Sequence, residues 1–196
     1  MQSHPELEVV EGTSIEGVVF ALMTNRTSID ADSATMLAKT VRQLVQNRAV
    51  VVIPENDPIL RVSGFVEDVF GADVELRSTI LNAEMVDPTK PGVHLMRMAS
   101  PSDYVETVTS LGATGASMIL LFSDSPLPLP GHPFIPLLRV GSKPSKTGLL
   151  DVLTSEGEEA LWRKMEAVLS RKEETKIEEK GLSDFQILRT MNGYSL

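Results

Sequence analysis

The 196-residue sequence contains no cysteine, which excludes disulfide bonds, thiolate metal sites, thiolate-held iron–sulfur clusters and cysteine nucleophiles. Aromatic residues make up only 5% of the chain, so the hydrophobic core must be built mainly from aliphatic side chains. Apolar residues nevertheless reach 42%. A chain of this length and composition is able to bury a substantial core.

Positive charge is also scarce, because 18 lysines and arginines stand against 27 aspartates and glutamates, a formal net charge of −9. Nucleic acids and anionic membrane surfaces both select for clustered Lys and Arg, so neither is an expected partner. No apolar run approaches the roughly 20 residues of a transmembrane helix. The acidic stretch MQSHPELEVVEG lacks the basic and apolar regions of a signal peptide. We therefore expect a cytoplasmic protein.

Short apolar runs alternate with segments of helical periodicity along most of the chain. The expected strands are residues 17–23, 49–53, 72–81, 93–98, 117–122 and 134–140, and the expected helices are residues 30–48, 57–71, 100–116 and 154–174. This alternation predicts a single α/β domain, Rossmann-like and three-layered, with a mainly parallel sheet and helices on both faces. Residues 1–153 are expected to form the α/β core, and residues 154–196 a carboxy-terminal helix and arm that pack on it.

The expected helix starts carry capping patterns. Ser155 and Glu158 have the spacing of a capping box. Asp57 and Pro58 open the segment 57–71, and a serine opens the segment 100–116.

Three of the expected strands run into segments rich in Pro, Ser and Asp. These segments are PENDP (54–58), ASPSD (99–103) and SDSPLPLPGHP (123–133). The carboxyl ends of parallel strands meet at one edge of the sheet, and open α/β sheets bind their ligands there. The sequence therefore predicts a ligand site assembled from these three strand ends.

Several chemistries are open to the residues at this edge. Glu55 and Asp57 are carboxylates able to bind a divalent metal or act as bases, although a helix cap is the preferred role for Asp57. Ser123 or Ser125 with His132 would make a hydrolase site, but the chain has no G-x-S-x-G elbow. Hydrolysis therefore has the weakest support from the sequence.

Longer stretches, taken in order, follow one known pattern. VVVIPENDPIL (50–60) is similar to a strand followed by SETPE. Residues 90–142 are similar to a strand ending in FMDTPG, a helix T-G-x-hydrophobic-A-x-G-A, a strand ending in FTTGRG and an NP-x-x-P segment. Residues 170–193 are similar to ASGEKTKSE…G…EF. In this order the chain resembles the C-terminal domain of the altronate dehydratase/galactarate dehydratase family.

Enzymes of that family are lyases that dehydrate sugar acids such as altronate and galactarate to 2-keto-3-deoxy acids, with a divalent metal that is typically iron. The resemblance thus implies a hydro-lyase domain of carbohydrate acid metabolism that uses iron or manganese, with metal ligands left unassigned. By position in the motifs it carries over Glu55 and Ser123. The resulting site hypothesis gives catalytic roles to Glu55, Ser123 and His132, and substrate binding to Arg97, Asp124 and Ser125.

The chain departs from the pattern at several of these positions. Arg97 stands where FMDTPG has its aspartate, and the Arg-Gly pair of FTTGRG is replaced by Pro-Leu. The family's small N-terminal domain and cysteine-containing middle segment have no counterpart here. We therefore expect a partner subunit that carries the missing segments, and we keep open a diverged non-catalytic subunit or sugar-acid-binding module. A homo-oligomer is also left open.

Arg97, Arg139 and Lys143 are cations of the type that is able to hold a sugar-acid carboxylate. For Arg139 and Lys143 we expect the ordinary charge of a strand edge instead.

Overall fold

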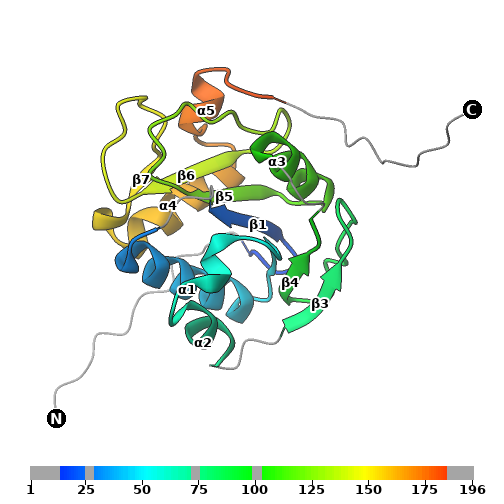
Figure 1. The fold of residues 1–196 in the computed structure, drawn as a ribbon. Helices are drawn as coiled ribbons and strands as arrows, with labels where there is room; N and C mark the ends of the chain where they lie inside the picture. Colours follow the sequence, from blue (N-terminus) through cyan, green and yellow to red (C-terminus); the bar gives the residue numbers. More distant parts are fainter. Residues whose placement is uncertain (1–13, 25–28, 72–75, 99–102, 185–196) are drawn as a thin grey trace, which may run out of the picture.

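The computed structural model describes residues 14–24, 29–71, 76–98 and 103–184. They form a seven-stranded sheet in the order β3-β4-β2-β1-β5-β6-β7 (Figure 1). Every neighbouring pair of strands is parallel, so the predicted parallel α/β fold is confirmed. The strands are β1 (Val19–Thr24), β2 (Val50–Pro54), β3 (Leu76–Ile80), β4 (Gly92–Met96), β5 (Met118–Phe122), β6 (Leu137–Gly141) and β7 (Val152–Leu153).

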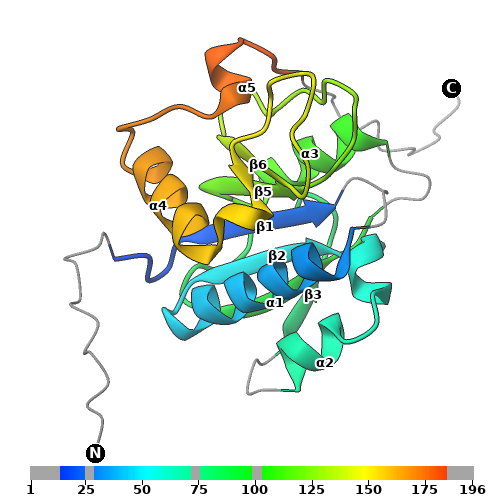
Figure 2. The ribbon, with the colours of Figure 1, turned by 90° about the vertical axis from the view of Figure 1, so that its left-hand side faces the viewer.

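Helices cover both faces of the sheet. They are α1 (Ala31–Gln46), α2 (Phe65–Phe70), α3 (Tyr104–Ala113), α4 (Glu158–Leu169) and α5 (Lys176–Glu179), with 3-10 turns η1 (Pro58–Arg61) and η2 (Thr154–Glu156). The helices α1, α2 and α4 contribute to one apolar cluster, and α3 and α5 contribute to the other. Figure 2 shows α1 and α4 on the near side of the sheet.

The side chains of β1 alternate between the two clusters. Phe20 and Leu22 lie in the cluster under α1, α2 and α4, whereas Ala21 and Met23 lie in the cluster under α3 and α5. All of β1, β2 and β5 is buried. A strand covered on both faces reads as a continuous apolar run, which is why these strands show no polar alternation in the sequence.

The segment 57–71 forms two short elements instead of the single helix that was expected. The cap predicted at Asp57 is confirmed, because its side chain accepts a hydrogen bond from the Ile59 amide at 2.9 Å. The turn η1 then ends, and α2 starts only after Gly64, whose φ of 86° lies in the left-handed region. A residue in that conformation interrupts a right-handed helix, so the apolar stripe is divided between η1 and α2.

Two other helix starts differ from their expected caps. The N-cap of α3 is Asp103, whose side chain accepts the Glu106 amide at 2.7 Å, and not a serine. Before α4, Gly157 has a φ of 83° and ends η2, so the helix begins at Glu158 without the capping box predicted from Ser155. Gly157 is at once the C-cap of η2 and the N-cap of α4, so no serine side chain caps this helix.

The helices beyond residue 153 are part of the core. Leu161, Met165 and Val168 of α4 lie in one apolar cluster, and Ile177 of α5 lies in the other. The rest of the expected arm, residues 185–196, lies outside the described residues. Among the helices of the described part of the chain, none has the length and apolar character required to cross a membrane.

Candidate functional site

The sheet reverses its strand order at β1. From β1 the chain passes through α1 to β2 on one side, and it later returns through α3 to place β5 on the other side. Open α/β sheets bind ligands outside the carboxyl ends of the strands at such a switch point. Figure 1 looks toward these carboxyl ends.

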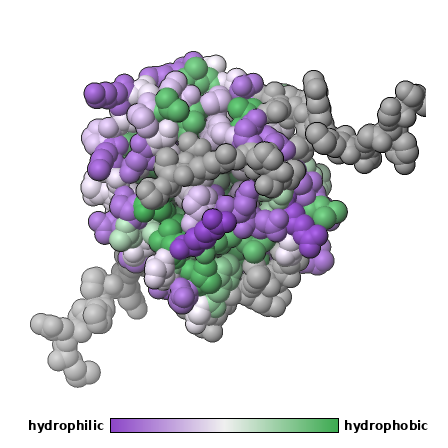
Figure 3. All heavy atoms as spheres, viewed as in Figure 1, coloured by the Kyte–Doolittle hydropathy of each residue, from purple (hydrophilic) through white to green (hydrophobic). Residues whose placement is uncertain are grey.

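A pocket of about 610 Å3 opens at this switch point. Its walls come from the segments that follow β1, β5, β6 and β7, and it is lined by Ile29, Asp30, Asp32, Asp124, Ser142, Lys143, Thr154 and Ser155. Figure 3, which has the same view as Figure 1, shows many hydrophilic side chains over the upper part of this face and an apolar area below its centre. The pocket is therefore suited to a small polar ligand.

Asp30 forms one wall of the pocket and caps α1. Its two carboxylate oxygens accept the Ser33 amide at 2.9 Å and the Ser33 hydroxyl at 3.0 Å. Partial burial alone would raise the pKa of Asp30, but hydrogen bonds from Ser33 and Ser142 outweigh this effect and lower the pKa. Asp30 is thus an ionised hydrogen-bond acceptor at neutral pH, and Asp32 in the first turn of α1 adds a second carboxylate.

Asp124 forms the opposite wall, just beyond β5. Its Oδ1 accepts the Ser142 amide at 2.7 Å, and its Oδ2 accepts the Ser142 hydroxyl at 2.5 Å. This contact requires a glycine at 141, because a Cβ there would lie 2.9 Å from Asp124 Oδ1 and 3.3 Å from the Ser123 carbonyl oxygen. Since Asp30 also interacts with Ser142, Ser142 lies between two carboxylates.

Lys143 brings a positive charge to the pocket. It is exposed, it is the only cation among the described lining residues, and it forms no ion pair with any residue in the described part of the chain. Thr154 and Ser155 add hydroxyl groups from η2. The pocket thus combines an ammonium group available to a ligand with carboxylates and hydroxyls that accept or donate hydrogen bonds.

Of the residues that the sequence singled out, Asp124 and Lys143 line this pocket. Lys143, for which ordinary strand-edge charge was the expectation, lies in the segment that follows β6. Glu55 and Arg97 follow β2 and β4, on the other side of β1, and both are exposed. The Glu55 amide donates to the Met96 carbonyl at 2.8 Å, and its Oε1 accepts the Met98 amide at 3.4 Å. Glu55 and Arg97 therefore lie near each other at the correct edge, but neither lines the pocket.

Ser123 and Ser125 are buried in the segment that leaves β5. Their hydroxyls accept the backbone amides of Ser125 and Leu127, each at 3.2 Å. His132 lies farther along, where the chain approaches the amino end of β6, and its ring packs against Gly112 near the end of α3. His132 Nδ1 accepts the Phe134 amide at 3.2 Å, and burial lowers the pKa of His132. These contacts do not bring a serine hydroxyl and His132 together.

Arg139 corrects an expectation from the sequence. It was interpreted as strand-edge charge, but it is completely buried. The reason is that β7 pairs outside β6 and makes β6 an internal strand. A strand of only two residues leaves little trace in a sequence, so the burial of Arg139 was not predictable from its surroundings.

Sequence reasoning missed most of the pocket. Asp30 follows the pattern of a helix N-cap, Ser155 that of a capping box, and Ser142 and Thr154 are single polar residues without a recognisable motif. Their shared feature is that each follows a strand of the same sheet. That feature becomes visible only when the strand order places β1, β5, β6 and β7 side by side.

Neither the pocket nor any other part of the described chain groups three or more His, Cys, Asp or Glu side chains as a divalent metal requires. These residues alone therefore do not fit the complete iron or manganese site that the family resemblance implies. No protein-family model matches the chain, and no curated protein sequence matches it.

Proposed function

We propose that this chain binds a sugar acid in the pocket at the switch point, and that it is one domain of a sugar-acid hydro-lyase of the altronate/galactarate type. The observation that carries the proposal is the lone Lys143 ammonium set among the carboxylates of Asp30 and Asp124. The order of motifs along the chain supports the choice of reaction. A partner subunit would complete the catalytic site.

A polyhydroxylated acid matches the groups that line the pocket. Lys143 is able to hold the ligand carboxylate through charge-assisted hydrogen bonds. Asp30 and Asp124 accept hydrogen bonds from ligand hydroxyls, and the Ser155 hydroxyl is able to donate or accept. The volume of about 610 Å3 lies within the usual range for small-molecule sites.

Dehydration removes the proton from the carbon beside the carboxylate and the hydroxyl from the next carbon. Water leaves, and the resulting enol becomes the 2-keto-3-deoxy acid. This step needs a base and a group that helps the hydroxyl depart. Glu55, the proposed acid or base, follows β2 and does not line the pocket. We therefore assign the chemical step to the assembly with a partner subunit.

The test is ligand binding by the purified chain, measured by calorimetry and thermal melting. The panel contains altronate, galactarate, the corresponding neutral sugar alcohols and a dicarboxylate without hydroxyls, each with and without ferrous or manganous ion. We expect the hydroxy acids to bind and to raise the melting temperature, because a ligand that binds only the folded state stabilises it. Binding that needs the ion would indicate that the ion accompanies the acid.

Lys143→Met should weaken acid binding by about tenfold, the loss of one charge-assisted contact. Lys146→Met is the matched control, because Lys146 is an exposed lysine of the same loop that does not line the pocket. Failure of every hydroxy acid to bind, or equal effects of the two lysine variants, would overturn the proposal.

A non-catalytic sugar-acid-binding module is the alternative, and one observation favours it. Glu55, Ser123 and His132, which the resemblance makes catalytic, do not line the pocket. Formation of a 2-keto-3-deoxy acid by the chain with its co-purifying partner, and its loss in Lys143→Met, would support the hydro-lyase. Acid binding without any turnover in that assembly would support the module.

A further inference from the structure

Among the residues that the structure describes, Arg139 of β6 is a buried arginine. Burial lowers its pKa, whereas the nearby charges of Asp124 and Asp151 act in the opposite direction. Arg139 is 0% exposed, and it forms no ion pair with any residue that the structure describes. Its Nε donates to the Ser123 carbonyl at 3.3 Å, its Nη1 to the Leu127 carbonyl at 3.4 Å, and its Nη2 to the Ser125 carbonyl. Burying a cation is costly unless it is paired or hydrogen-bonded, and here three backbone carbonyls of residues 123–127 accept hydrogen bonds from the guanidinium.

The local hydrogen bonds of residues 123–127 leave three of their carbonyls directed toward the guanidinium of Arg139. The hydroxyls of Ser123 and Ser125 accept the amides of the residues two positions ahead, as serine does in tight turns. Pro126 has no amide hydrogen to place. The amides of Ser125 and Leu127 are thus satisfied within the segment, and the Ser123 amide donates to the Val140 carbonyl of β6 at 2.9 Å. The carbonyls at positions 123, 125 and 127 accept from Arg139.

A second contact fixes the far end of the same segment. The Tyr104 hydroxyl, at the start of α3, donates to the Pro130 carbonyl at 2.9 Å. Tyr104 and Arg139 lie close enough to influence each other electrostatically. The segment 123–130 therefore follows its path on polar anchors that come from β6 and α3.

Asp124 lies between two of the anchored residues. The carbonyls of Ser123 and Ser125 are held by Arg139, and the Asp124 carboxylate is thereby directed away from the core toward Ser142. Shifting this segment would move the wall of the pocket. The guanidinium itself does not line the pocket.

We infer that Arg139 is a positioning residue of the pocket, since its guanidinium is the template on which residues 123–127 fold and by which Asp124 is set against Ser142. Its effect on ligand affinity rests on the function proposed above, whereas its effect on the loop does not. The planar fork of arginine reaches several carbonyls at once, which a lysine ammonium on a flexible stem does not reproduce.

The experiment compares Arg139→Ala and Arg139→Lys with the unaltered chain by amide hydrogen exchange and by sugar-acid calorimetry. We expect faster exchange at the amides of Ser125, Leu127 and Ser142, and acid affinity lower by about tenfold, as for other supporting residues of binding sites. Guanidinium ion at low millimolar concentration should restore slow exchange and affinity to Arg139→Ala, because it fills the vacated site. Methylammonium should not.

Leu138→Ala is the matched control. Leu138 is the preceding residue of β6 and is equally buried, but its side chain lies in the cluster on the opposite face of the sheet. It should lower global stability without selectively opening residues 123–127. If Arg139→Ala does not fold, Arg139→Lys carries the test, with faster exchange at Leu127 expected.

The inference is overturned if the Arg139 variants change exchange at Ser125, Leu127 and Ser142 no more than Leu138→Ala does, or if guanidinium has no effect on a folded Arg139→Ala. The outcome for the ligand is separate. Local opening that guanidinium reverses, in a chain that binds no sugar acid even when unaltered, would sustain the role of Arg139 and reject the proposed function.

Discussion

Asp57 illustrates how single residues connect the strands to their carboxyl-end loops. It is only 4% exposed, and its carboxylate accepts the Thr24 amide at 2.7 Å, the Thr24 hydroxyl at 2.5 Å and the Ile59 amide at 2.9 Å. Burial raises the pKa of Asp57 although these hydrogen bonds act in the opposite direction. One side chain thus caps η1 and ties the end of β1 to the segment after β2.

Asp57→Ala should lower the free energy of unfolding by about 2–4 kcal/mol, because a helix cap is lost and buried donors of Thr24 and Ile59 are left without their acceptor. Urea denaturation followed by circular dichroism measures this change. Glu166→Ala, an exposed glutamate on α4, is the control and should change stability by less than about 0.5 kcal/mol. Similar losses in both variants would contradict this account of Asp57.

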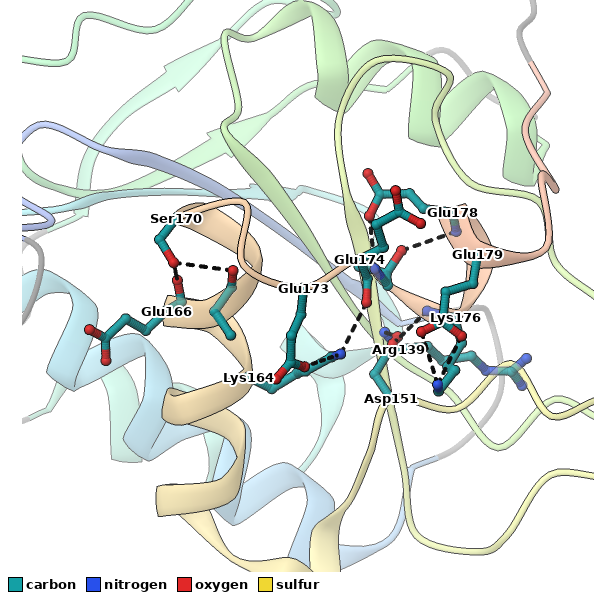
Figure 4. A network of polar contacts seen from close by, with 12 residues as sticks. Arg139, Asp151, Lys164, Glu166, Ser170, Glu173, Glu174, Lys176, Glu178 and Glu179 are labelled. Atoms are coloured by element: carbon teal, nitrogen blue, oxygen red, sulfur yellow. Dashed lines mark hydrogen bonds and ion pairs between the residues drawn. The ribbon is translucent and has the colours of Figure 1, made fainter.

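At the scale of elements, the junction of β6, α4 and α5 depends on Asp151 (Figure 4). Its Oδ2 accepts the Arg139 amide of β6 at 2.8 Å, and its Oδ1 accepts the Lys176 amide at the start of α5 at 2.8 Å. Lys164 of α4 joins the same region by donating to Glu173 Oε2 at 2.8 Å and to the Glu174 carbonyl at 3.0 Å. These contacts hold α5 against the sheet.

Asp151 should make stability depend on pH. Burial raises its pKa to about 6, although the amides of Arg139 and Lys176 and the charges of Lys164 and Lys176 lower it. The folded protein favours the neutral carboxyl of Asp151. The stability that this protonation contributes is therefore fully present below the ordinary pKa of 3.8 and is lost as the pH rises through about 6.

The comparison with Asp151→Asn isolates this contribution. The unfolding free energy of the unaltered chain, relative to that of the variant, should fall by about 2–3 kcal/mol between pH 4 and pH 7. Urea denaturation at several pH values provides the measurement. Parallel pH profiles for the two proteins would show that Asp151 does not titrate in this range.

At the scale of the whole molecule, stability comes from two aliphatic clusters that cover the sheet on both faces. The described residues contain no group of three or more metal-binding side chains. We therefore expect a chelator to leave the melting temperature of the purified chain unchanged, unlike that of proteins whose fold depends on a structural metal. Scanning calorimetry with and without EDTA tests this. A decrease of several degrees that manganese reverses would reveal a structural site.

The sequence by itself determined the fold class, because apolar runs of strand length alternating with amphipathic segments have few ways to bury their surfaces. It also placed the cap at Asp57, where the interacting residues are two positions apart. Contacts between residues so close in the chain are predictable from the local sequence. The burial of strands on both faces follows for the same reason from their unbroken apolar runs.

Only the tertiary structure decided which strand ends lie side by side. The order β2-β1-β5-β6-β7 separates Glu55 from Asp124 and brings Asp124 to Ser142. His132 lies late in the connection between β5 and β6, with its ring against Gly112. Arg139 is buried beneath residues 123–127. These contacts join residues far apart in the chain, and the pairing of strands that creates them depends on the packing of the whole sheet.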